Sequence, residues 1–472
     1  MPNSFPYKRP LVIGAGISGV GLVKLILRLG AEATLADVKK ESAIRSETVL
    51  PESPRVEYRF GDAFPETLDG HDLLALSPGV PLNHPLVKLA REGNVEVTGE
   101  LELAVRYADK PYAAVTGSNG KTTCAALAAH ILKASGFKPF LGGNIGFGLA
   151  ELLSSLPAGE GGGCDCLVLE VSSFQLETVE RFHAKGAALL NLTPDHLDRH
   201  GSMAEYSRMK ERIFLNQTEE DVSVLNLDDP ALAGTRPGGR LFGFSRRKDP
   251  GKSGARLIKR DGRDFIEFHE GGGIVSEEEC LGLSFSGPAN MENLMAAAGL
   301  AHSLGVPLKG IVAKARGFKA DRHRLELVGR VNGVEYYDDS KATNTGAVEA
   351  ALGNFPPRSV YLVMGGRDKD LDFSVLAAAV KRKVKRLLLI GEAAPKIESQ
   401  LRGSAPAERL GSLEEAVRRA GDLAKAGDAV LLSPACASYD MFKNYKERGE
   451  AFQREVLRLK EGSPDDPRET RC

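Results

Sequence analysis

The sequence predicts a three-domain α/β protein in which each domain is built on a mostly parallel sheet. The chain has 472 residues, which is too long for a single hydrophobic core and corresponds to about three domains at roughly 150 residues each. A pattern of apolar strand, glycine-rich turn and helix begins near Leu11, restarts at Tyr112 and restarts again near Val334. Such alternation of strands and helices is typical of parallel sheets whose faces are covered by helices.

The composition excludes several classes of protein. Hydrophobic residues make up 42% and charged residues 26% of the chain, which is typical of a globular protein and excludes a disordered or fibrous one. Lys and Arg number 62 against 63 Asp and Glu, so no excess of positive charge is available to hold a nucleic acid or a membrane surface. No stretch approaches the roughly 18 apolar residues of a membrane span, and residues 1–10 lack the apolar part of a signal peptide.

The six cysteines favour a reducing compartment. They are too sparse and too irregularly spaced for a disulfide framework in a chain of this length. Cys164 and Cys166 are separated by one residue, whereas zinc sites typically separate paired cysteines by roughly two to four. We therefore expect a cytoplasmic protein without a cysteine-bound metal.

The first glycine turn predicts a nucleotide site. An expected strand at residues 11–13 runs into residues 14–19, with the sequence GAGISG, and then into an apolar helix that continues to Leu29. Glycine in such a turn lets a phosphate approach the backbone, and the start of the helix offers free N–H groups with about half a positive charge. The motif alone favours NAD or FAD, with Asp37 after the expected strand 33–36 as the ribose partner. It is also compatible with a purely structural turn.

A second turn makes a UDP group a serious alternative. Residues 77–80, SPGV, follow the expected strand 73–76. Because the carboxyl ends of parallel strands meet at one edge of a sheet, this turn is placed where it can contact the same nucleotide.

The restart at Tyr112 predicts a phosphate-binding loop. Residues 116–123, TGSNGKTT, connect an expected strand to an expected helix at 124–133. In this context backbone N–H groups surround the phosphates of ATP, Lys121 neutralises their charge and Thr122 holds Mg²⁺. The spacing departs from the general pattern, because Val115 occupies the position of its first glycine.

Two further strands end in polar residues that can face this loop. The expected strand 167–169 ends in Glu170, and the expected strand 187–192 ends in residues 193–200, TPDHLDRH. A carboxylate at this edge can coordinate Mg²⁺, and a His can bind a metal or orient a phosphate. A buried strand that merely ends in an acid, and a loop that is only solvated surface, are the alternatives.

Two stretches are predicted to separate the domains. Residues 109–111, DKP, precede a fresh strand, and the Gly- and charge-rich stretch 317–324 follows an expected helix at 296–303. The predicted domains are a Rossmann-like N-terminal domain at residues 1–109, a central P-loop ATPase-type domain at 110–317 and a C-terminal Rossmann-like α/β domain at 318–472.

Three other segments carry predictions of lesser consequence. Residues 236–273 contain short alternating pieces and suggest a hairpin insert. The Pro- and charge-rich tail 462–472 is expected to be mobile. Lys210 lies on an expected helix at 204–214, where helix statistics alone predict a solvated lysine.

Several segments together resemble the Mur ligase family across nearly the whole chain. These segments are 117–123 (GSNGKTT), 142–146 (GGNIG), 170–176 (EVSSFQL), 195–199 (DHLDR), 339–344 (DSKATN) and 432–438 (LSPACAS). The resemblance implies an amide ligase of peptidoglycan synthesis that depends on ATP and Mg²⁺. The last two segments resemble the branch that adds D-glutamate to UDP-N-acetylmuramoyl-L-alanine through an acyl phosphate, with release of ADP and phosphate. A monomer that contacts neither nucleic acid nor membrane is the default expectation.

The resemblance also implies a role for each residue that matches a family motif. The residues expected to bind ATP are Gly117, Ser118, Asn119, Gly120, Lys121, Thr122, Thr123, Asn290, Asn293, Arg324, Asp339 and Lys341. Those expected to bind the UDP-muramoyl substrate are Gly16, Ile17, Ser18, Asp37, Ser77, Gly79, Asn144, Ser173 and Gln175. Those expected to bind D-glutamate are Thr343, Lys369, Ser438 and Tyr445. The expected metal ligands are Thr122, Glu170, His196 and a carbamylated Lys210, and the expected catalytic residues are Lys121, His196 and Lys210.

Four positions depart from the family pattern. Ala289 stands where the family usually has a His before the first of two Asn residues, so the contribution of that ring to nucleotide binding is absent or replaced. Phe147 and Gly148 differ from the usual residues after the glycine motif, and Tyr445 replaces a common Phe. These departures bear on the muramoyl and D-glutamate contacts.

Three rival interpretations remain at this point. An oxidoreductase built on residues 14–19 would use a nicotinamide or a flavin, but it leaves the loop at 117–123 without a role. A non-catalytic nucleotide switch would bind ATP without acceptor-dependent release of ADP. A sibling ligase, including a folylpolyglutamate ligase, would keep the chemistry and take a different amino acid.

Overall fold

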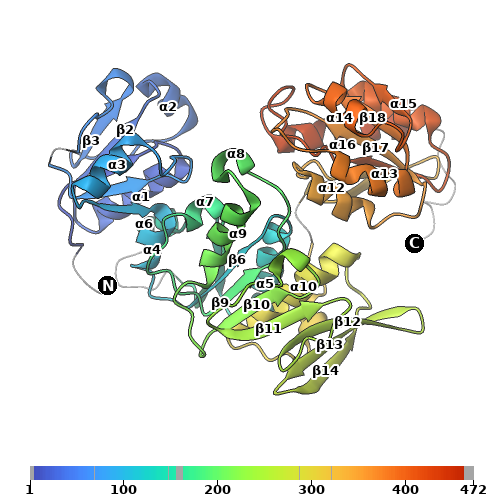
Figure 1. The fold of residues 1–472 in the computed structure, drawn as a ribbon, viewed down its shortest axis with the longest axis horizontal. Helices are drawn as coiled ribbons and strands as arrows, with labels where there is room; N and C mark the ends of the chain where they lie inside the picture. Colours follow the sequence, from blue (N-terminus) through green and yellow to red (C-terminus); the bar gives the residue numbers. More distant parts are fainter. Residues whose placement is uncertain are drawn as a thin grey trace. The chain divides into compact units, whose positions relative to one another are not determined.

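The computed structural model describes residues 5–68, 70–146, 148–155, 163–285, 287–319 and 322–461. It contains three sheets (Figure 1), and most of their strand pairs are parallel. The predicted α/β class with mostly parallel sheets is therefore confirmed. Phe147 and the tail 462–472 lie outside the described residues, so the predictions made for them stay predictions.

The chain divides into two compact units. The first comprises residues 1–192, 199–284 and 291–318, and the second comprises residues 193–198, 285–290 and 319–472. The first unit holds two of the sheets and the second unit holds the third. The proposed domain boundaries after residues 109 and 317 stay predictions.

The first sheet is entirely parallel and has the order β3-β2-β1-β4-β5. Its strands are β1 (Pro10–Ile13), β2 (Ala33–Asp37), β3 (Val56–Phe60), β4 (Leu73–Leu76) and β5 (Glu96–Gly99). Its helices are α1 (Ile17–Arg28), α2 (Glu41–Glu47), α3 (Pro85–Glu92) and α4 (Glu100–Val105). The strand order reverses at β1, and such a reversal opens a crevice at the carboxyl ends of the strands. The glycine turn that follows β1 lies in this crevice.

The second sheet has the order β14-β13-β12-β11-β10-β9-β6-β8-β7. Its strands are β6 (Tyr112–Thr116), β7 (Pro139–Gly143), β8 (Cys166–Glu170), β9 (Gly186–Leu189), β10 (Val222–Asn226), β11 (Arg240–Ser245), β12 (Gly254–Arg260), β13 (Arg263–Glu270) and β14 (Gly273–Glu279). Strand β6, which leads into the predicted phosphate loop, lies between β8 and β9. The ends of the three strands singled out in the sequence are therefore neighbours.

The segment at 236–273 was expected to be a hairpin insert, and this prediction is only partly right. Strands β12 and β13 do form an antiparallel hairpin. However, β12 pairs in parallel with β11, and β14 adds a further antiparallel strand, so these strands extend the second sheet. Parallel pairing of two consecutive strands usually needs a connection of about a dozen or more residues, whereas only residues 246–253 separate β11 from β12, so the local pattern did not reveal this pairing.

The helices of the central part differ from their expected bounds by a few residues. They are α5 (Lys121–Ala134), α6 (Leu149–Ser155), α7 (Ser173–Leu176), α8 (Leu197–His200), α9 (Met203–Glu211), α10 (Pro288–Ser303) and α11 (Ile311–Ala315). Helix α10 begins eight residues before the expected position 296, at Pro288, because the fixed φ of proline suits the first turn of a helix. Helix α9 ends at Glu211 and continues as a 3-10 turn, Arg212–Phe214.

The third sheet has the order β15-β16-β20-β17-β18-β19. Its strands are β15 (Glu326–Val331), β16 (Val334–Asp338), β17 (Val360–Gly365), β18 (Val384–Ile390), β19 (Ala407–Arg409) and β20 (Ala429–Leu432), and its helices are α12 (Thr345–Leu352), α13 (Ala377–Lys383), α14 (Ala394–Gln400), α15 (Leu413–Leu423) and α16 (Tyr445–Glu461). Alternate residues of β17 enter different cores: Leu362 packs in the core that contains α12 to α14, and Val363 in the core that contains α15 and α16. Helices therefore cover both faces of this sheet (Figure 1).

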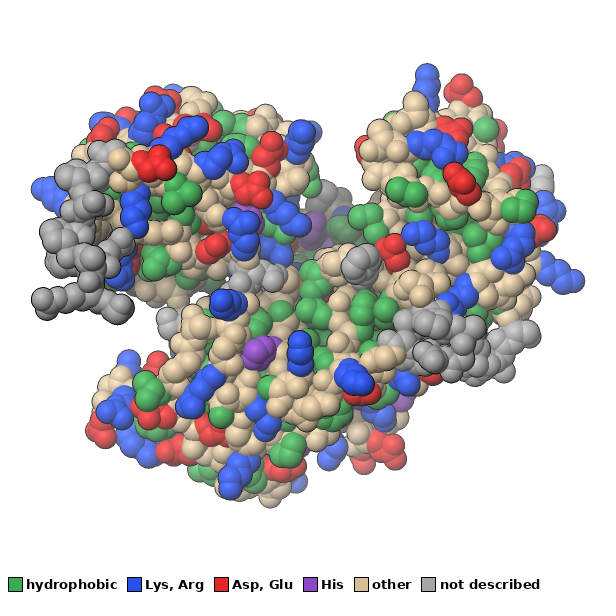
Figure 2. All heavy atoms as spheres, turned by 180° about the vertical axis from the view of Figure 1, so that it is seen from behind, with side chains coloured by type: hydrophobic (Ala, Val, Ile, Leu, Met, Phe, Trp, Pro, Cys, Tyr) green, Lys and Arg blue, Asp and Glu red, His purple; other side chains and the backbone are tan. Residues whose placement is uncertain are grey.

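The described part of the chain offers no helix that is both long enough and apolar enough to cross a membrane. Figure 2 shows basic and acidic side chains interspersed over the face that it draws, without one large patch of either sign.

Gly449 in α16 packs without space for a side chain. A Cβ atom there would lie 2.1 Å from Nδ1 of His323 and 2.7 Å from Oδ2 of Asp338. These two atoms already share a buried hydrogen bond of 2.7 Å. We expect Gly449→Ala to lower the free energy of unfolding by about 2–3 kcal/mol, because overpacking forces neighbouring groups apart. Denaturant unfolding measures this, with Glu450→Ala on the exposed face of the same helix as the control. Equal stability of the two variants would show that the helix shifts to relieve the contact.

Candidate active site

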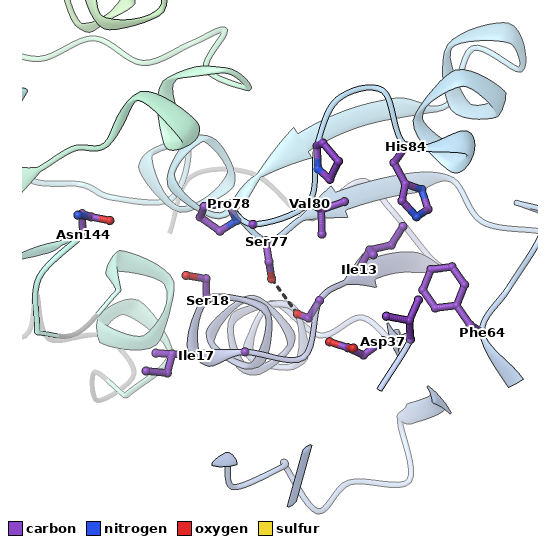
Figure 3. Close-up of a pocket in the computed structure, with 15 residues that line it drawn as sticks. Ile13, Ile17, Ser18, Asp37, Phe64, Ser77, Pro78, Val80, His84 and Asn144 are labelled. Carbon is purple, nitrogen blue, oxygen red and sulfur yellow. Dashed lines mark hydrogen bonds between the residues drawn. The ribbon is translucent and has the colours of Figure 1, made fainter. Parts of the chain in front are cut away.

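A cavity of about 610 Å³ lies at the carboxyl ends of the strands of the first sheet (Figure 3). It is bounded by the turn after β1, by the turn after β4 and by the end of β2. Of the residues expected to bind the UDP-muramoyl substrate, the cavity is lined by Gly16, Ile17, Ser18, Asp37, Ser77, Gly79 and Asn144. Ser173 and Gln175 do not line it.

Hydrogen bonds hold the turns that border this cavity. The Ser77 hydroxyl donates to the carbonyl oxygen of Gly14 over 2.7 Å, which joins the two turns. The Asp37 carboxylate accepts from the backbone N–H of Ala15 at 2.8 Å and from that of Lys39 at 2.9 Å. Asp37 therefore fixes the glycine turn from the neighbouring strand, and its contact with a ribose stays a prediction.

Two of the residues that line this cavity were not identified from the sequence, and Arg199, which the sequence placed in the polar segment 193–200, supports one of its turns. Phe64 and His84 line its wall, and their rings meet edge to face with centroids 5.9 Å apart. The guanidinium of Arg199 donates to the carbonyl oxygens of Gly79 at 3.3 Å and Val80 at 3.0 Å. Arg199 thus holds the second turn, although 120 residues separate it from Gly79.

The predicted phosphate loop connects β6 to α5. Gly120 precedes the helix with a φ of +84°, and a Cβ atom there would lie 2.4 Å from Oδ1 of Asn293. Glycine is therefore required at this position both by conformation and by space. The Lys121 ammonium donates to the carbonyl oxygens of Gly117 and Ser118, each at 2.8 Å. The side chain of Lys121 is thus bonded to the backbone of the predicted phosphate loop itself.

Asn191 supports the other side of the loop. Its side-chain oxygen accepts from the N–H of Asn119 at 2.8 Å, and its carbonyl oxygen accepts from the N–H of Ser118 at 3.0 Å. Asn191 follows β9, whereas the loop follows β6, and these two strands are neighbours in the sheet. Asn191 is not among the residues predicted from the sequence.

Oxygen-bearing side chains meet at the end of β8. The hydroxyl of Thr122 donates to one carboxylate oxygen of Glu170 at 2.7 Å, and the amide of Asn144 donates to the other at 3.1 Å. Glu170 is buried, so the interpretation of a strand that merely ends in an acid is insufficient. Carboxylate and hydroxyl oxygens are donors that Mg²⁺ prefers, and Thr122 with Glu170 therefore fits the expected ion.

Lys210 is buried, with 2% of its surface exposed. The helix-statistics interpretation of a solvated lysine is therefore wrong, because α9 packs this face against the loop. Its ammonium donates to the carbonyl oxygen of Gly117 at 2.8 Å and lies 4.8 Å from the ring centroid of Tyr206. The Tyr206 hydroxyl in turn lies 3.1 Å from that of Ser118. Tyr206 is a second supporting residue that the sequence analysis missed.

The polar segment after β9 divides between the two units. Residues 193–198 belong to the second unit, and Arg199 and His200 belong to the first. His196 lies 3.7 Å from the carboxylate of Asp195, which also accepts from the amide of Asn344 at 3.2 Å. The ring of His200 is buried 3.0 Å from the hydroxyl of Ser173. The segment is therefore more than solvated surface, and a metal-binding role of His196 stays a prediction.

The two Asn residues expected near the adenine both lie on α10. Asn293 is buried in the first unit beside Gly120, and Asn290 belongs to the second unit.

In the second unit, Asp339 is a buried acid next to residues expected to contact ATP. It accepts from the Ser433 hydroxyl at 2.8 Å and from the N–H of Leu325 at 3.2 Å. Burial raises the pKa of Asp339 to about 7, against the opposing effects of the Ser433 hydrogen bond and the positive charge of Arg324. The Lys341 ammonium lies 5.5 Å from the ring centroid of Tyr445.

The residues expected to bind D-glutamate follow three neighbouring strands. Thr343 comes after β16, Lys369 after β17 and Ser438 after β20, and β20 lies between the other two. A bridge between Arg367 and Ala437 joins the segments after β17 and β20. The fourth residue, Tyr445, begins α16. The sheet thus places three of the four residues along one edge.

The raised pKa of Asp339 predicts a dependence of stability on pH. Because the folded pKa lies above its ordinary value of 3.8, this group favours folding at low pH, and that contribution is lost as the pH rises from about 4 through 7. We expect Asp339→Asn to gain stability relative to the wild type over this range, by a few kcal/mol in total, since one pKa unit corresponds to about 1.4 kcal/mol. Unfolding curves from pH 5 to 8 measure it. Parallel pH profiles for the two proteins would contradict the expectation.

Models of three protein-family domains match the chain. The Mur ligase MurD-like N-terminal domain matches residues 8–99, the Mur ligase middle domain matches residues 115–301, and the Mur ligase glutamate ligase domain matches residues 323–436. The chain belongs to the Mur ligase family.

Curated relatives of this Mur ligase are similar along their whole length. One from Caldanaerobacter subterraneus subsp. tengcongensis, named UDP-N-acetylmuramoylalanine--D-glutamate ligase, is 40% identical over 459 residues, which are 96% of this chain and 99% of the relative. One of the same name from Pelotomaculum thermopropionicum is 40% identical and is covered completely, with 98% of this chain matched.

Solved structures of Mur ligases share the fold. A MurF ligase from Thermotoga maritima in complex with ADP superposes with a TM-score of 0.62 at 19% identity, covering 97% of each chain. The UDP-N-acetylmuramate-alanine ligase from the same organism gives a TM-score of 0.56 at 18% identity, covering 96% of this chain and 99% of its own. At these identities the likeness establishes the three-sheet architecture of the Mur ligases alone.

Proposed function

We propose that the protein is an ATP- and Mg²⁺-dependent ligase that joins D-glutamate to UDP-N-acetylmuramoyl-L-alanine, with release of ADP and phosphate. The observation that carries this proposal is the 40% identity, over 96% of the chain, to relatives named for this reaction. The reaction belongs to peptidoglycan synthesis and thus to cell shape and division. A monomer that works in the cytoplasm is part of the proposal.

The UDP-muramoyl substrate is assigned to the cavity of the first sheet. Its turns present backbone N–H groups and the start of α1 toward a diphosphate, and helix starts favour anions. Asn144 lines the cavity and bonds to Glu170 at the end of β8, which supports assigning the carboxylic acid end of the substrate to the side of Glu170. Ser173 and Gln175 are assigned to this end, because they lie on the helix that follows β8.

ATP is assigned to the loop before α5. Lys121 would exchange its contacts with the loop carbonyls for the phosphate oxygens, and Thr122 with Glu170 would hold Mg²⁺. Bound Mg²⁺ supplies positive charge that offsets the charge of the phosphates. A second metal held by His196 and a carbamylated Lys210 stays part of the proposal, as do contacts from Asn290, Asn293, Arg324, Asp339 and Lys341.

The chemistry proposed for this site follows from the poor reactivity of carboxylates. A carboxylate resists attack because its charge is delocalised, so the γ-phosphoryl group of ATP is first transferred to one of its oxygens. The amine of D-glutamate then attacks the acyl carbon, the C–N bond forms, and phosphate leaves with the C–O bond electrons. The residues of the chain contribute mainly by positioning and by charge.

The incoming D-glutamate is assigned to the edge formed after β16, β17 and β20. Lys369 can pair with a carboxylate of the amino acid, and the hydroxyls of Thr343 and Ser438 can donate to it, through bonds that are stronger for a charged acceptor. Tyr445 would close this edge. The proposal also includes domain boundaries after residues 109 and 317.

Release of ADP and phosphate tests the proposed function. The assay supplies ATP, Mg²⁺ and UDP-N-acetylmuramoyl-L-alanine, and compares D-glutamate with L-glutamate, L-alanine and meso-diaminopimelate. Turnover is expected with D-glutamate. Turnover with another amino acid would change the branch, and no turnover with any of them would remove the ligase assignment. The oxidoreductase alternative predicts that the protein binds NADH. A titration with NADH, followed by fluorescence, measures this binding.

A further inference from the structure

Glu100 is a buried acid at the first residue of α4, which follows the last strand of the first sheet. Only 2% of its surface is exposed. One carboxyl oxygen, Oε1, accepts from the N–H of Ala150 at 2.8 Å, near the start of α6. The other oxygen, Oε2, has no hydrogen-bond partner among the described residues. Burial raises the pKa of this acid, since a buried charge is costly.

Gln175 is a second buried side chain that interacts with Glu100. Gln175 is buried, and its side-chain oxygen accepts from both the N–H and the hydroxyl of Ser172, each at 3.0 Å. The amide nitrogen therefore points the other way, and the interaction of Gln175 with Glu100 opposes the rise in the pKa of that acid. An amide has one acceptor end and one donor end, so the two bonds from Ser172 fix which way the Gln175 amide points.

The two segments held by Glu100 are those to which the proposed function assigns the substrate. Helix α6 continues the stretch that contains Asn144, which lines the cavity and bonds to Glu170. Helix α7 carries Gln175 and directly follows the end of β8. Helix α4 packs against both α6 and α7. One acid from the side of the first sheet therefore links two segments at the edge of the second.

We propose that Glu100 is a positioning residue for the UDP-linked substrate: as a hydrogen-bond acceptor it fixes Gln175 and the start of α6 in the arrangement that the acid end of this substrate requires. The inference rests on the proposed function and deepens it. It assigns no contact between Glu100 and the substrate, and no role in binding ATP or D-glutamate.

Steady-state kinetics of Glu100 variants test this role. Glu100→Ala removes the acceptor, and Glu100→Asp keeps the acid but shortens its reach. Both are expected to raise the KM for UDP-N-acetylmuramoyl-L-alanine about tenfold, while the KM for ATP, the KM for D-glutamate and kcat change less than about threefold. Glu100→Gln keeps the acceptor oxygen in a neutral group and is expected to restore a KM within about twofold of the wild type.

Thr98 provides the matched control. It is fully buried one residue before the turn into α4, and its hydroxyl has no hydrogen-bond partner among the described residues. Thr98→Val should leave all three KM values unchanged. A double-mutant cycle with Gln175→Ala adds a second readout. If Glu100 and Gln175 act as a unit, the double variant should raise the KM for UDP-N-acetylmuramoyl-L-alanine no more than the more damaging of the two single variants does.

Several outcomes would overturn the inference. If Glu100 had only a general role in folding, its variants would raise all three KM values together. Glu100→Gln would then not selectively restore the KM for UDP-N-acetylmuramoyl-L-alanine. Independent effects of the two residues would make the cycle additive. If Glu100→Ala does not fold, Glu100→Asp carries the same comparison. An inactive wild type would refute the proposed function, whereas an active wild type with unchanged KM in these variants would refute only the role of Glu100.

Discussion

Lys121→Ala is expected to reduce the release of ADP by about a thousandfold while leaving the free energy of unfolding close to that of the wild type. Groups that stabilise charge on a transferring phosphoryl group have effects of about this size. The stability should change little, because the ammonium donates to carbonyl oxygens of its own loop and the side chain is only half-buried. Initial rates of acceptor-dependent ADP release measure the first quantity, and denaturant unfolding measures the second.

Lys133→Ala is the matched control for this variant. Lys133 is an exposed lysine in the last turn of the same helix, α5. Its loss removes the same charge from the chain without altering the loop, so full activity is expected. A Lys121→Ala protein that kept more than about a tenth of the wild-type rate would place the phosphates elsewhere.

Lys210→Met and Lys210→Arg are both expected to lower kcat by about a hundredfold or more. The proposal gives Lys210 a carbamate, whose carboxylate can bind a metal, whereas neither methionine nor arginine can carry this group. The arginine variant is informative because it keeps a positive charge near the carbonyl oxygen of Gly117, which the lysine ammonium contacts at 2.8 Å. High activity of Lys210→Arg would show that a cation is sufficient and that no carbamate is needed.

The supply of carbon dioxide gives an independent measurement for Lys210. Wild-type activity should fall in buffer depleted of carbon dioxide and return when bicarbonate is added. Arg208→Ala, at an exposed position of the same helix, should follow the wild type in both conditions. Activity that ignores bicarbonate would argue against a carbamate on the wild-type enzyme.

The parts of the site that the sequence predicted are local in the chain. The loop at 116–123 and the turn at 14–19 were identifiable because the strand, the glycines and the helix that define each of them are consecutive residues. Glu170 was identifiable because it ends an apolar run at a strand terminus. These patterns do not depend on which strands become neighbours.

The missed residues act across long separations. Asn191 supports Asn119 from 72 residues away, and Tyr206 contacts Ser118 from 88 residues away. Strand pairing and helix packing decide such contacts, and no pattern within a short window reports them. The burial of Lys210 has the same origin. Its side chain is buried because of what α9 packs against, and the sequence of the helix itself does not report that packing. The strand β15 was missed because Gly329 and two charged residues, Glu326 and Arg330, interrupt its apolar pattern.

The two bonds that Lys121 makes within its own loop have a consequence for nucleotide selectivity. Under the proposed function the ammonium exchanges contacts with these carbonyl oxygens for ligand oxygens, so occupancy of the loop would be an exchange of partners. Triphosphate oxygens compensate for that exchange with full negative charges, whereas adenosine has none to offer. Discrimination between ATP and its dephosphorylated relatives can therefore arise at a single side chain, before any part of the protein reads the base.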